Sequence, residues 1–150
     1  MTWPFVHPLW VHYPVALLTL AAPAAFAWSV RPGVGTRAVW VSLSVVGFAG
    51  AVAAYLTGGA MVEADFVMSL ERIERHELLG EWTMYVAGAQ ALLAGSVEWS
   101  ARSGASAGPA LRAAVAALSL GTAVLTGWTA HLGASDVWPE LVSPADGHTR

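Results

Sequence analysis

The chain contains no cysteine and no lysine, and charged residues make up only 11% of its 150 residues. Without cysteine there is no disulfide, thiolate metal site, iron–sulfur cluster or covalently attached c-type haem. Soluble domains carry about a quarter charged residues, so the low charge argues against a soluble protein. All seven basic residues are arginine, and no nucleic-acid partner is expected.

Long uncharged stretches take the place of the missing charge. Hydrophobic residues make up 56% of the chain, and residues 4–30, 38–62, 82–97 and 113–135 carry no charge. Each stretch is close to or above the roughly 17–25 residues that cross a bilayer, and we expect the first to be retained, not cleaved. The sequence predicts an all-α integral membrane four-helix bundle, up-down-up-down, as a single domain over residues 1–150. Its helices are expected at about 13–30, 37–61, 77–100 and 109–131.

The connection between the second and third helices has a helical pattern of its own. Phe66, Leu70 and Ile73 recur at helical spacing among charged residues. This pattern predicts a short interfacial amphipathic helix over about residues 64–75, with a solvated loop as the alternative.

The placement of arginine predicts the orientation. The short loops after the first and third helices hold four arginines, and the opposite side holds three. Because arginine favours cytoplasmic loops, we expect both termini on the outer, periplasmic side of a bacterial inner membrane. The tryptophans support the spans: Trp28, Trp40 and Trp99 fall near the cytoplasmic boundary and the other five near the outer one. A core role for one or two of these rings would leave this pattern intact.

Four of the five histidines collect at the outer end of the expected bundle. His7 and His12 precede or open the first helix, His76 opens the third, and His131 closes the fourth. Each could be an ordinary hydrogen-bonded interfacial residue, but neutral imidazole is also the commonest metal ligand, and ionisable groups in membrane bundles tend to mark function. His148, in the tail, is expected to be a solvated surface residue.

Small residues lie one helical turn deeper than three of these histidines, namely Ala16, Gly80 and Gly127. Residues four apart share a helix face, so these positions leave a slot for a flat macrocycle between helices. Small residues also serve ordinary close packing of membrane helices, which weakens the argument.

Three kinds of site fit the histidines. Two imidazoles per iron make a low-spin haem b, so His7, His12, His76 and His131 would serve one haem or two. A copper ion is the second possibility, because Met61, Met68 and Met84 also lie toward the outer side. The third is a histidine–carboxylate centre that would include Glu63, Asp65 and Glu77.

Pro14 leaves the start of the first helix open. If the helix begins at Tyr13, His12 caps it; if it begins at Pro8, it contains a proline that removes a backbone hydrogen bond. In the second case His7 and His12 point about 140° apart at 3.6 residues per turn, and would hardly bind the same iron.

Two segments resemble a known family. The first is His7-Pro8-Leu9-Trp10-Val11-His12-Tyr13-Pro14, and the second runs from Leu125 to Gly133 and contains Thr126, Gly127 and His131. The first is similar to the His-Pro-x-x-Val-His-Phe-Pro signature, and the second to the fourth-helix Thr-Gly signature, of a bacterial four-helix membrane family, domain of unknown function 2231. The resemblance implies a four-helix membrane fold in a redox setting, but family members often carry a Tyr-x-His-Gly stretch after the Thr-Gly that this chain lacks.

We therefore expect a haem b-binding membrane protein that transfers electrons, either as a carrier or as a subunit of a respiratory or photosynthetic complex, rather than a stand-alone enzyme. Its expected partners are the lipid bilayer, other redox or membrane-complex proteins and a possible quinone. The alternatives are a copper or other metal-binding membrane protein and a cofactor-free accessory subunit. No histidine lies in the cytoplasmic half, so any haem is expected to exchange electrons on one side.

Overall fold

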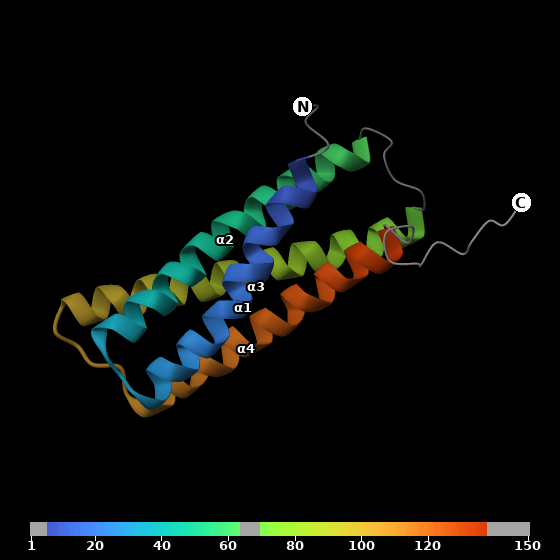
Figure 1. Ribbon diagram of the computed structural model, residues 1–150. Helices are drawn as coiled ribbons and strands as arrows, with labels where there is room; N and C mark the ends of the chain where they lie inside the picture. The colour runs from blue at the N-terminus through green and yellow to red at the C-terminus, as the bar shows by residue number, and fades with distance from the viewer. Residues whose placement is uncertain (1–5, 64–69, 138–150) are drawn as a thin grey trace, which may run out of the picture.

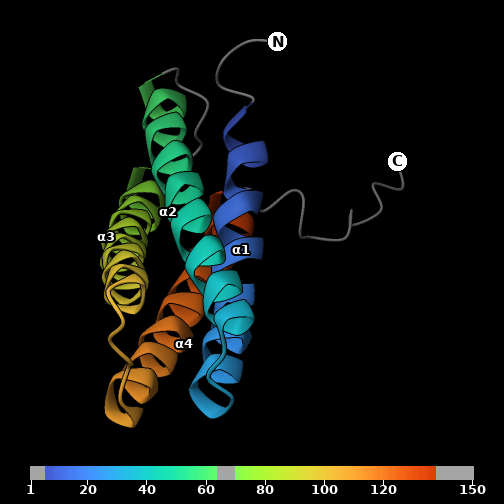
Figure 2. The same cartoon turned by 90° about the vertical axis from the view of Figure 1, so that its left-hand side faces the viewer.

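The structure is a computed structural model that describes residues 6–63 and 70–137. Its helices are α1 (His7–Val30), α2 (Val34–Glu63), α3 (Leu70–Arg102) and α4 (Pro109–Leu132), and a π-helical turn, η2 (Gly133–Val137), follows α4. Each helix packs against its neighbour in sequence, and α4 returns to lie beside α1 (Figures 1 and 2). The described residues contain no strand. The predicted all-α four-helix bundle is therefore confirmed.

Three segments are long and apolar enough to cross a membrane: His7–Val30, Val34–Ala60 and Pro109–Ser135. Helix α3 has 33 residues, but charged side chains crowd its first turns. Its uncharged part, residues 82–97, belongs to the bundle, because α3 packs against two of the apolar helices, α2 and α4. The chain is thus a multi-pass helical membrane bundle in which one helix extends as a charged segment.

Helix α1 begins earlier than its expected start at residue 13. Pro8 lies in the first turn, where a missing N–H costs nothing, and Pro14 is accommodated inside the helix. Of the two alternatives for the first helix, the structure therefore has the one that begins near Pro8 and contains Pro14. The expected interfacial helix falls partly on residues 64–69, outside the described residues, while residues 70–75 form the first turns of α3.

The two ends of the bundle differ in chemistry. We call the end where α1 and α3 begin the histidine end, and the opposite end, which carries Arg31, Arg37, Arg102 and Arg112, the arginine end (Figure 1). A core cluster closes the arginine half, where the rings of Trp28 and Trp40 stack 5.4 Å apart. These two tryptophans are buried, so they are core residues and not members of a lipid-facing belt. Their stack lies within the buried core of the arginine half.

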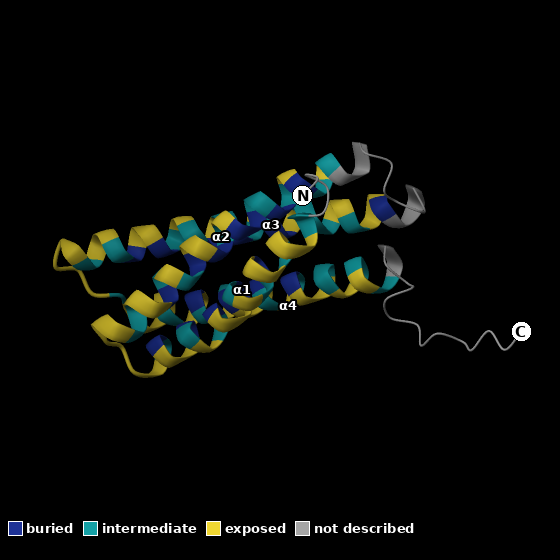
Figure 3. Ribbon diagram, turned by 45° about the horizontal axis from the view of Figure 1, so that its top comes forward, coloured by how far each residue is buried: buried dark blue, intermediate teal, exposed yellow. Residues whose placement is uncertain are grey.

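Polar side chains line the interior of the bundle. The Trp40 indole N–H donates to Ser119 Oγ over 3.0 Å, and Gln90 Nε2 donates to Ser44 Oγ over 2.9 Å, which links α2 to α4 and α3. Leu92 and many other large apolar residues are exposed instead, and exposed residues recur along every helix (Figure 3). Apolar groups outside and polar groups inside suit a lipid surround, where polar side chains of neighbouring helices hydrogen-bond to one another.

An ion pair ties α2 to α3 at the arginine end. Glu98 accepts hydrogen bonds from Arg102 Nε and from Arg37 Nε, each over 3.0 Å. The hydrogen bond from Arg102, and then that from Arg37, lower the pKa of the Glu98 carboxyl. Because that pKa is lower in the folded state, the pair stabilises the fold above the usual pKa of glutamate, and the contribution is lost as the pH falls through the lowered value.

Replacing Glu98 with glutamine is therefore expected to flatten the acid side of the stability profile. The wild-type thermal midpoint in detergent should fall more steeply on acidification than that of Glu98→Gln, and near neutral pH the variant should be slightly less stable. Scanning calorimetry across the acid range measures both slopes. Parallel slopes would show that the pair contributes nothing to folding.

Candidate functional site

A cavity of about 750 Å³ lies inside the histidine end. This volume falls within the roughly 300–1,000 Å³ of typical small-molecule and cofactor sites. All four helices and the start of η2 contribute to the wall, which is mostly apolar and includes Val11, Pro14, Ala51, Ala54, Ile73 and Ala130. The bundle therefore has a tryptophan-centred core at the arginine end and a cavity at the histidine end.

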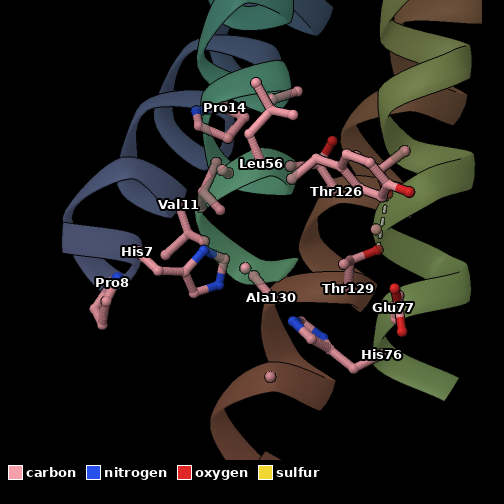
Figure 4. Close-up of a pocket in the computed structure, with 18 of the residues that line it drawn as sticks. His7, Pro8, Val11, Pro14, Leu56, His76, Glu77, Thr126, Thr129 and Ala130 are labelled. Carbon is pink, nitrogen blue, oxygen red and sulfur yellow. Dashed lines mark hydrogen bonds between the residues drawn. The ribbon is translucent and has the colours of Figure 1, made fainter. Parts of the chain in front are cut away.

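Two histidines from different helices point into this cavity. Figure 4 shows the imidazole of His7, on α1, and that of His76, on α3, directed toward one another past Ala130 of α4. Both side chains are half-buried, and both line the same cavity. The sequence placed these residues at one level, and the structure brings them to opposite walls of one space.

Each of the two rings rests on a glycine. A Cβ added at Gly58 of α2 would lie 3.0 Å from His7 Cε1, and one added at Gly133 would lie 2.7 Å from His76 Cε1. Real Cβ atoms rarely or never approach so closely, so a larger residue at either position would push the ring away. The two glycines thus seat the imidazoles, and neither is one of the three small residues expected one turn beneath the histidines.

The other expected site residues lie elsewhere. His12 borders the cavity but is exposed, and its Nδ1 is hydrogen-bonded to the Pro8 carbonyl of its own helix. His131, Ala16 and Gly127 are exposed and are not among the residues that line the cavity, whereas Gly80 is. Of the three small residues expected beneath the histidines, the structure places Gly80 alone at the site.

Threonine hydroxyl groups add polar atoms at and near the cavity wall, and the histidine pattern did not indicate them. Thr83 of α3 and Thr129 of α4 share a hydrogen bond of 2.8 Å at the cavity wall, and Thr57 of α2 lies 3.1 Å from His7 Nδ1. One signal in the sequence could have found the α4 members. Ser119, Thr122, Thr126 and Thr129 recur at helical spacing and therefore share one face.

In the described part of the chain, no three histidine, aspartate or glutamate side chains come together as a metal site. Glu77 does border the cavity, but it is exposed. The side chains of Met61, Glu63, Asp65 and Met68 lie outside the described residues. The donors that the structure brings together are two imidazoles facing one apolar space.

Fold and cavity together define the class: a multi-pass helical membrane protein with a histidine-lined cavity at one end of its bundle. The family model described as predicted membrane protein, domain of unknown function 2231, matches residues 4–144. The chain belongs to this family, as the two sequence signatures predicted. No curated protein and no solved structure matches it.

Proposed function

We propose that this protein binds one haem b in the cavity, with His7 and His76 as the two axial ligands, and passes electrons at the histidine end. The observation that carries the proposal is the pair of imidazoles that face one another from α1 and α3 across an apolar space. A bis-histidine haem has no open coordination position, so it supplies one-electron transfer rather than dioxygen chemistry.

The composition of the cavity favours haem over a bare metal ion. Protein sites for single zinc or copper ions generally use three or more protein ligands, whereas a bis-histidine haem needs two. The described residues offer two inward imidazoles and no group of three ligating side chains. The apolar walls and a volume of about 750 Å³ suit a macrocycle with an apolar body.

The packing supports exchange on one side of the membrane. The stacked tryptophans and the core cluster fill the arginine half, so the cavity is confined to the other half. With the arginine end in the cytoplasm, as the arginine pattern favours, the haem would lie toward the periplasmic face of a bacterial inner membrane. A carrier or complex subunit, with a second redox protein or a quinone as partner, fits this position.

Haem titration of the purified protein in detergent tests the proposal. We expect one haem per chain, a Soret band, and the sharp low-spin bands of a six-coordinate iron after reduction. Copper titration under the same conditions should show no stoichiometric site. Protein expressed with ample haem that shows no Soret band, and takes up none on titration, would refute haem binding and leave a cofactor-free subunit as the better description.

A further inference from the structure

The contacts of His7 assign its proton to one ring nitrogen. Thr57 Oγ1 lies 2.8 Å from the Ala53 carbonyl and 3.1 Å from the Ala54 carbonyl, both on its own helix. A hydroxyl has a single proton, and a carbonyl can only accept. The Thr57 proton is therefore directed at its own backbone, and its oxygen lone pairs remain for another donor.

His7 Nδ1 is that donor. It lies 3.1 Å from Thr57 Oγ1, so the hydrogen bond between them requires the proton on Nδ1. With the Thr57 hydroxyl turned to its own helix, this contact selects the Nδ1–H tautomer.

Thr57 is itself held firmly. It is 4% exposed, and Gly58, the residue that follows it, is the seat of the His7 ring. One stretch of α2 therefore fixes both the position of the imidazole and the nitrogen that carries its proton. With Nδ1 protonated, Nε2 keeps its lone pair. Ligand histidines in metal sites are commonly oriented by such a hydrogen bond from the other ring nitrogen.

We propose that Thr57 is a positioning residue that holds His7 as the Nδ1–H tautomer, so that Nε2 is the ligand atom presented to the cavity. This inference rests on the proposed haem site. A hydrogen bond from Nδ1–H to an acceptor makes the imidazole a stronger donor and favours the oxidised iron, so losing it is expected to raise the reduction potential.

The test compares Thr57→Val, which removes the acceptor at nearly constant shape, with Thr57→Ser, which keeps it. Haem affinity should fall about tenfold or more in Thr57→Val, the size of effect usual for loss of an outer-shell partner. The reduction potential should rise in the same variant. Thr57→Ser should retain the wild-type values, which a purely structural role for the side-chain volume does not predict.

A second measurement needs no haem. Nitrogen-15 NMR of imidazole-labelled apo-protein should show His7 as the Nδ1–H tautomer in the wild type and in Thr57→Ser, with Nε2–H appearing in Thr57→Val. An Nε2–H wild-type ring, or a potential and tautomer unchanged in Thr57→Val, would overturn the role of Thr57. Failure of the wild type to bind haem would instead overturn the proposed function and leave the tautomer result standing.

Discussion

Alanine in place of His76 is expected to abolish the low-spin spectrum of the haem-loaded protein, and His7→Ala should do the same. Each change removes one of the two imidazoles that face the cavity, and the iron would be left with a single protein ligand. The loss of affinity should exceed the roughly 10- to 100-fold that removal of an outer-shell partner costs. Spectra and haem-to-protein ratios of the purified variants measure it.

The chain supplies a matched control for these two variants. His131→Ala removes an exposed imidazole at the same end of the bundle that does not line the cavity, so it should leave the spectrum and the stoichiometry unchanged. Imidazole added to the buffer should partly restore the low-spin bands of His76→Ala, because a free ligand can occupy the space of the missing ring. A spectrum that depends on His131 and not on His76 would contradict the assignment.

Replacing Gly50 with alanine is expected to destabilise the bundle by about 1–2 kcal/mol. Glycine to alanine inside a helix normally gains about 0.5–1 kcal/mol in conformational entropy. Here the new Cβ would lie 2.9 Å from Tyr13 Cβ and 3.2 Å from the Pro14 backbone nitrogen, neither of which is the mobile end of a side chain. Overpacking of this kind costs about 1–3 kcal/mol and outweighs the gain.

Gly95→Ala is the control for that experiment. An added Cβ at Gly95 of α3 meets nothing within 4 Å, so this variant should keep the helix gain without the clash. Thermal unfolding in detergent should therefore shift the midpoint down for Gly50→Ala and leave it unchanged or raised for Gly95→Ala. Equal midpoints would mean that α1 and α2 can separate at Gly50 at little cost.

The sequence was sufficient for the helices but not for their rotation. The uncharged lengths and the likeness to the family predicted four helices and their order. Rotation is harder to predict in a membrane protein because the lipid-facing side of a helix is as apolar as its packed side. Hydropathy therefore does not show which side of a helix faces its neighbours, and this side must be inferred from small or hydroxyl-bearing residues.

The candidate site shows the same limit. The cluster of histidines at one end was visible in the sequence, but which of them point inward was not. His7 and His12 lie on one helix about 140° apart, so His7 is half-buried at the cavity and His12 is exposed at its border. Gly58 and Gly133, which seat the two rings, belong to α2 and to the turn after α4. Their contacts with His7 of α1 and His76 of α3 arise from the packing of the helices, which the sequence does not show.

The stacked tryptophans at the arginine end also imply that the two halves of the bundle differ in how easily their helices separate. Trp28 and Trp40 close one half with large rings, while in the other half the helices surround a hollow of about 750 Å³. Segments with few buried contacts open at lower free energy than the packed core. The histidine end is therefore expected to open at a lower free energy than the arginine end, which would let a large flat ligand enter while the arginine half stays folded.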